Sequence, residues 1–194
     1  MFDGTNDYVY VTSNSDLRPT NNYSVEAWVN TNEIGEIQTI IKHSENGGGN
    51  DAWGFSITAD GRLTFSAMNS NADQYIESNE ILRPGEWYYV VGVYDNSTFK
   101  VYINGELDKT QSGTGNVAYE TTDYVIIGKR GGTALPNTCY FNGTIDSIRF
   151  YTRVLSTTEI LSNYQSGNIE MRYRTSTDNR TWSSWSGAGE DIEG

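Results

Sequence analysis

The sequence predicts an all-β fold in which two antiparallel sheets pack face to face, with one short helix near the C-terminal end. Short runs of alternating apolar and polar residues follow one another, separated by clusters of Asn, Gly, Asp and Ser. Aromatic residues make up 13% of the chain, with 14 Tyr but only three Pro, which is typical of strands and turns. Several runs are apolar on both faces, and two packed sheets bury such strands economically.

The first part of the chain contains five expected strands. Tyr23 and the apolar residues at every second position after it define one face of a strand, while Trp28 lies on its other face and is expected in the core. The dipeptide Asp60-Gly61 is a strong hairpin signal between two of the runs. The expected strands lie at 9–11, 23–29, 37–41, 53–57 and 63–67.

The second part adds four strands and a helix. Residues 87–94 are apolar on both faces, so this run predicts a central strand with Trp87 in the core. Ser156-Thr157-Thr158-Glu159 is a capping box that predicts a helix reaching about Tyr164. The remaining expected strands lie at 99–103, which ends at Asn104-Gly105, at 124–128 and at 144–151.

Charge and composition exclude several classes of function. Thirteen Lys and Arg stand against 25 Asp and Glu, giving a net charge of −12, so neither nucleic acid nor an anionic membrane surface is an expected partner. No apolar run approaches the roughly 20 residues of a membrane helix, and no membrane insertion is expected. Cys139 is the only cysteine, which excludes an internal disulfide and a zinc site built on several thiolates.

Five segments in order resemble the laminin G-like, concanavalin A-like jelly-roll domains. They are Phe2-Asp3-Gly4-Thr5-Asn6-Asp7-Tyr8-Val9, Tyr23-Ser24-Val25-Glu26-Ala27-Trp28-Val29, Gly85-Glu86-Trp87-Tyr88-Tyr89-Val90-Val91, Val101-Tyr102-Ile103-Asn104-Gly105-Glu106-Leu107 and Phe141-Asn142-Gly143-Thr144-Ile145-Asp146-Ser147-Ile148-Arg149-Phe150-Tyr151, and Arg153-Val154-Leu155-Ser156 follows them. The resemblance implies a two-sheet antiparallel jelly-roll sandwich over residues 1–166. Residues 167–194 are expected to form a β-hairpin tail, which either docks on the sandwich or begins a following β-rich module.

The resemblance also implies a kind of function. Such domains serve mostly as non-catalytic recognition modules in secreted and cell-surface proteins, so we expect an extracellular module excised from a larger chain, with a glycan or a surface protein as partner. Carbohydrate binding or adhesion is the leading expectation. A structural or adhesive spacer that binds protein partners is the alternative, followed by a fragment of a glycoside hydrolase.

A structural Ca²⁺ ion is a further implication of the resemblance. The positions that match the family pattern are Asp146, as a carboxylate ligand, and the segment Phe2-Asp3, through a backbone or side-chain oxygen, with a carbonyl from residues 42–46 as a third contributor. Calcium prefers six to eight oxygen ligands, which an acidic chain supplies. The alternative is that both aspartates cap turns and accept hydrogen bonds from backbone amides.

Glycan binding requires exposed aromatic faces beside planar polar side chains. The candidates are aromatic residues on expected loops together with their polar neighbours, and the alternative for each aromatic residue is packing at a strand end. The predicted ligand-binding residues are Trp53, Asp73, Tyr75, Tyr119, Arg130, Asn137 and Tyr140.

Catalysis is not expected. Glucanases of the same broad fold present two carboxylates on one strand as Glu-x-Asp-x-x-Glu, because cleavage of a glycosidic bond needs an acid and a second carboxylate. The nearest match is Glu106-Leu107-Asp108-Lys109-Thr110-Gln111, in which Gln111 replaces the second glutamate at an exposed hairpin. The sequence therefore predicts a binding domain rather than an enzyme.

Overall fold

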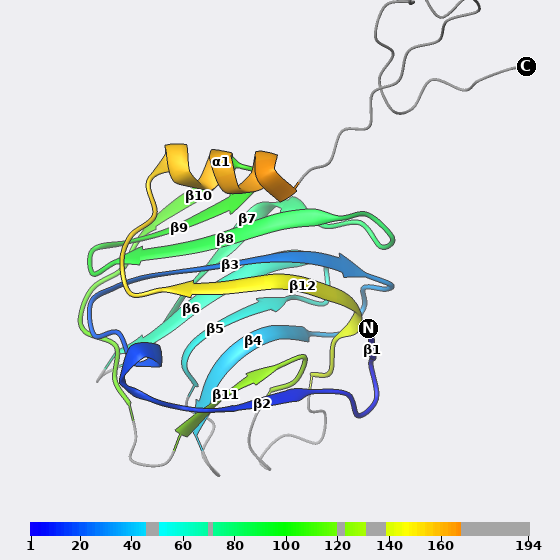
Figure 1. The fold of residues 1–194 in the computed structure, drawn as a ribbon, viewed down its shortest axis with the longest axis horizontal. Helices are drawn as coiled ribbons and strands as arrows, with labels where there is room; N and C mark the ends of the chain where they lie inside the picture. Colours follow the sequence, from blue (N-terminus) through cyan, green and yellow to red (C-terminus); the bar gives the residue numbers. More distant parts are fainter. Residues whose placement is uncertain (46–50, 70–71, 120–122, 131–138, 168–194) are drawn as a thin grey trace, which may run out of the picture.

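Two six-stranded antiparallel sheets form a sandwich, as the sequence predicts (Figure 1). The computed structural model describes residues 1–45, 51–69, 72–119, 123–130 and 139–167. Sheet A has the strand order β1 (Phe2–Asp3), β12 (Asn142–Tyr151), β3 (Asn22–Thr31), β8 (Tyr88–Asp95), β9 (Thr98–Ile103) and β10 (Glu106–Ser112). Sheet B has the order β2 (Val9–Thr12), β11 (Asp123–Ile127), β4 (Gln38–Glu45), β5 (Asp51–Ile57), β6 (Arg62–Asn69) and β7 (Ala72–Ile81).

The main core lies between the two sheets and is rich in aromatic rings. Tyr23, Phe55 and Phe65 are fully buried there, together with the inward-facing aliphatic residues of both sheets. Trp53 is also fully buried; its ring stacks on Phe150 at 4.8 Å and its indole N–H donates to the Leu17 carbonyl. The short helix η1 (Ser15–Leu17) thereby ties to β5. Burying large rings in this way compensates for the modest aliphatic content.

A second core lies on the outer face of sheet A beneath helix α1 (Thr157–Gly167) (Figure 1). Ile160 is fully buried against this face, and the Tyr164 ring stacks on Trp28 at 5.7 Å. The capping box forms as predicted: the Glu159 carboxylate accepts from the Ser156 amide at 2.8 Å, and the Glu159 amide donates to Ser156 Oγ at 3.2 Å. The helix explains why β8 is apolar on both faces.

One residue that the sequence predicts in the core, Trp87, lies outside it. Trp87 precedes β8 rather than lying within it, and its exposed fraction is 47%. The alternation of β8 begins at Tyr88, whose face joins the main core, while Tyr89 begins the face that packs under α1. The prediction that Trp87 is in the core is therefore wrong, because the strand starts one residue later than its apolar run.

Glu26 is a carboxylate buried under α1 that joins the helix to sheet A. It accepts hydrogen bonds from the hydroxyls of Tyr89 (2.6 Å) and Tyr151 (3.1 Å), from the guanidinium of Arg149 (2.7 Å) and from the side-chain amide of Asn163 (2.9 Å). Burial, together with the neighbouring carboxylate, raises the pKa of Tyr89 far above its usual range. Because Asn163 belongs to α1, this network holds the helix to β3, β8 and β12.

No described helix combines the length and the apolar character that a membrane span requires.

Candidate groove on sheet B

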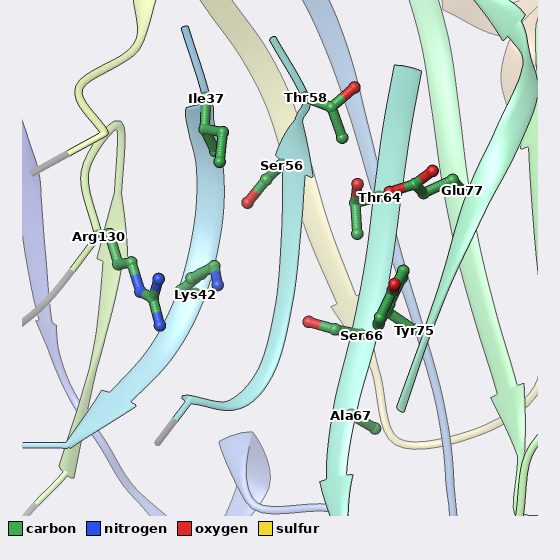
Figure 2. A pocket seen from close by; sticks show the side chains of 10 residues that line it. All are labelled: Ile37, Lys42, Ser56, Thr58, Thr64, Ser66, Ala67, Tyr75, Glu77 and Arg130. Carbon is green, nitrogen blue, oxygen red and sulfur yellow. The ribbon is translucent and has the colours of Figure 1, made fainter. Parts of the chain in front are cut away.

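A groove of about 340 Å³ runs over the outer face of sheet B (Figure 2). Its lining side chains come from β4, β5, β6 and β7, and from the residues just before β4 and just after β5 and β11. Sites for small ligands begin at about this volume. Helix α1 packs on the outer face of sheet A, on the opposite side of the sandwich from this groove.

The floor of the groove consists of small hydroxyl side chains. Phe55, Ile57, Leu63 and Phe65 face the core, so strand alternation directs the residues between them outward. Ser56 pairs with Thr64, and Gly54 pairs with Ser66, so these small residues lie next to one another across β5 and β6. The Thr64 hydroxyl oxygen is buried and has no hydrogen-bond partner among the described residues. The floor is therefore low, polar and able to offer hydrogen bonds.

The β7 wall presents an aromatic ring beside a carboxylate. Tyr75 has an exposed fraction of 53%, and Glu77 follows it on the same face of the strand. The backbone of β7 is fixed from the opposite sheet, because Gln111 of β10 donates to the Tyr75 carbonyl at 2.7 Å. Gln74 adds two hydrogen bonds to the backbone of Thr114, at 2.7 and 2.8 Å. Tyr75 is thus an exposed ring on an anchored strand.

The opposite wall contains two cations. Lys42 extends from β4, and Arg130 reaches the groove from the chain that follows β11 (Figure 2). Both side chains are half-buried. Ile37, which is 52% exposed, adds an apolar surface just before β4. The groove therefore has apolar surface at both walls and hydroxyl side chains on its floor.

Two of the predicted ligand-binding residues, Tyr75 and Arg130, come together in this groove. Trp53 does not, because it is fully buried in the main core, and the prediction that it contacts a ligand is wrong. Tyr119 is half-buried; its hydroxyl donates to the Pro19 carbonyl and its ring contacts the buried His43 at 4.9 Å. It packs against these neighbours and does not line the groove.

The other predicted residues lie elsewhere or outside the described part of the structure. Tyr140 is half-buried, with the Lys129 ammonium 5.4 Å from its ring centre, and it is not among the residues that line the groove. The side chain of Asp73 and the whole of Asn137 fall outside the described residues.

Most residues of the groove were not predicted from the sequence, because they lie on the outer faces of strands and the predicted ligand-binding residues lie on expected loops. Ser56, Thr64, Ser66, Lys42 and Glu77 each lie on a strand between core-facing neighbours. The signal that identifies Ser56, Thr64 and Ser66 is the same period-2 alternation that identifies the core, read for the polar positions.

The two predicted calcium ligands are not brought together. Asp3 pairs with Asn142, which is four residues, or roughly 13 Å, along β12 from Asp146. The Asp3 carboxylate accepts hydrogen bonds from the amides of Thr5 and Asn6, the first of which contributes most to lowering its pKa. Asp146 accepts from the amide of Ser147 at 2.7 Å.

A single cation held by both aspartates therefore does not fit this geometry. Across the described ranges, no three His, Cys, Asp or Glu side chains cluster as metal ligands. Calcium bound at Asp146 with other oxygens stays a prediction of the resemblance.

The near-match to a glucanase motif has a structural role. Asp108 lies at a bulge in β10, and its carboxylate accepts from the amides of Asn79 (2.6 Å) and Glu80 (3.0 Å) on β7. These bonds join β10 to β7, and thus connect the edge strands of the two sheets. Among the described residues that line the groove, Glu77 is the only carboxylate, whereas glycoside hydrolysis of this type uses two.

Solved structures with the same architecture come from several organisms. The SAP-like pentraxin of Limulus polyphemus matches with a TM-score of 0.65 and 16% identity, over 84% of this chain and 79% of that one. The CBM40 of the Ruminococcus gnavus IT-sialidase, bound to α2,3-sialyllactose, matches with a TM-score of 0.61 and 22% identity, over 75% of this chain and 83% of that one. A putative carbohydrate-binding protein from Bacteroides ovatus matches with a TM-score of 0.63 and 16% identity, over 80% of this chain but only 44% of that one.

The TM-scores of 0.61–0.65 show a shared fold. None of the curated protein sequences matches this chain. The model of the laminin G-like family described as the concanavalin A-like lectin/glucanases superfamily matches residues 3–161. With that match over most of its length and the two-sheet sandwich described above, the chain belongs to the concanavalin A-like lectin/glucanases superfamily.

Proposed function

We propose that this domain is a non-catalytic carbohydrate-binding module of a larger extracellular or cell-surface protein, and that the groove on sheet B holds the glycan. The observation that carries the proposal is the exposed Tyr75 ring standing beside a floor of hydroxyl side chains. Aromatic rings stack on the C–H faces of sugars, while hydroxyl and charged groups bond the sugar hydroxyls.

The comparisons support this proposal. The family description includes lectins, and the R. gnavus domain of the same fold is a carbohydrate-binding module with a sialylated sugar bound. The absence of a second carboxylate among the described lining residues favours binding over hydrolysis.

The experiment is a glycan-array screen of the purified domain, followed by titration of the strongest hit by calorimetry. Tyr75→Ala should weaken binding at least tenfold, because stacking on the ring is lost. Trp87→Ala is the matched control: it also removes an exposed aromatic residue, but one that does not line the groove, and it should leave affinity unchanged.

Three outcomes would overturn the proposal. Equal loss of affinity in both variants, or none in Tyr75→Ala, would place the glycan elsewhere. A blank array would favour the spacer role, with protein partners as the next class of ligand to screen.

A further inference from the structure

We propose that the groove binds an acidic glycan, with a carboxylate or sulfate group of the sugar held at the β4 wall by Lys42 and Arg130. The inference rests on the proposed glycan-binding function and specifies the class of sugar. It follows from where the molecule places its few cations.

The chain has 13 basic residues against 25 acidic ones, yet two of the basic residues line one wall of a single groove. Lys42 and Arg130 are 88 positions apart in sequence, and the pairing of β4 with β11 brings them to the same wall. Two cations on one wall repel each other and together attract an anion. An anionic group bound there would form charge-assisted hydrogen bonds, which are roughly twice as strong as neutral ones.

Gly54 leaves the space on β5 that the side chain of Lys42 occupies. A glycine in the middle of a strand weakens it, and such a residue often marks a site where another group approaches closely. A Cβ atom added at Gly54 would lie 2.8 Å from Lys42 Cγ and 3.0 Å from Lys42 Cε. The lysine stem therefore packs over Gly54 of β5, and this contact holds the side chain at the groove that it lines.

The opposite wall determines the orientation of the sugar. Glu77 on β7 repels an anion and accepts hydrogen bonds from neutral hydroxyls. The acidic group must then point toward β4, while the sugar ring faces Tyr75. The groove therefore has positive charge at the β4 wall and negative charge at the β7 wall, and an acidic sugar fits it in one orientation.

The array used above also tests this inference, provided that it carries neutral, carboxylated and sulfated glycans with matched backbones. We expect the hits to be confined to glycans with carboxylate or sulfate groups. Comparing uronic or sialic acid glycans with sulfated neutral glycans identifies which anion is recognised. Raising NaCl from 0.05 to 0.5 M should weaken binding of the hit.

Three variants locate the anion. Lys42→Gln and Arg130→Gln should each weaken binding of the acidic hit at least tenfold. Gly54→Ala keeps the lysine but displaces its stem, and it should weaken binding of the acidic hit as well. Lys129→Gln is the matched control, since Lys129 directly precedes Arg130 but does not line the groove, and it should leave affinity unchanged. Thermal midpoints confirm that every variant is folded.

The outcomes separate the inference from the proposed function. Hits that are neutral glycans and depend on Tyr75 would overturn the acidic-sugar inference and leave the carbohydrate-binding module in place. Acidic hits whose affinity is unchanged in Lys42→Gln and Arg130→Gln would also overturn it. A blank array would overturn both.

Discussion

Replacing Glu26 by glutamine should destabilise the domain by about 3 kcal/mol, although the side chain keeps its shape. The carboxylate accepts four hydrogen bonds at 2.6–3.1 Å, and Glu26 itself is fully buried. A hydrogen bond to a charged group contributes about 1.5–3 kcal/mol and a neutral one about 0.5–1.5 kcal/mol, so each bond to the oxygen that glutamine keeps weakens by roughly 1 kcal/mol. The other oxygen becomes an NH2 group, which cannot accept the two hydrogen bonds made there. Arg149 has a half-exposed side chain, which water screens, and its bond counts for less.

Guanidinium denaturation followed by circular dichroism measures this loss directly, and the midpoint of thermal unfolding should fall by roughly 6–12 °C for a domain of this size. Glu106→Gln, at an exposed position on β10, is the control and should change stability by less than about 0.5 kcal/mol. A loss below about 1 kcal/mol in Glu26→Gln would refute the account of the network.

Three further predictions follow from the fold. Trp53→Ala should cost about 3–5 kcal/mol by leaving a cavity, whereas Trp87→Ala should cost under about 1 kcal/mol; similar losses in urea titrations would contradict the core assignment. The ion pair with Arg153 and the cap lower the Glu159 pKa to about 2 from its ordinary 4.5, so their stabilisation is complete above pH 4.5 and lost as pH falls toward 2. Thermal midpoints of Glu159→Gln should therefore vary less across that window than those of the parent. A calcium ion at Asp146 should raise the thermal midpoint over that in chelator; equal midpoints would exclude it, and a rise that survives Asp146→Ala would place it elsewhere.

The strands that bury one face were predictable, because alternation is a direct consequence of strand geometry. The turn at Asn104-Gly105 was predictable as well. Asn104 and Gly105 both adopt positive φ, at 52° and 84°, as expected of the two central residues of a type I′ turn.

Strands β7 and β10 were not predicted, and their burial explains why. On β10 every residue is exposed or half-buried, and on the described side chains of β7 only Ile76 and Ser78 are buried, so neither strand has the apolar alternation of a core strand. Both are edge strands, held to one another partly by side chains such as Asp108 and Gln111. The groove was missed for a related reason, since its floor consists of serine and threonine, which are equally common in loops.

Helix α1 and the groove lie on different faces of the domain. The helix covers the outer face of sheet A, and the groove lies on the outer face of sheet B, so the two occupy opposite sides of the sandwich. Gly167, the last residue of the helix, therefore lies on the side of the domain opposite the groove. Substitutions beneath the helix and substitutions in the groove therefore act on opposite faces of the sandwich, so Glu26→Gln tests the attachment of α1 without changing a residue that lines the groove.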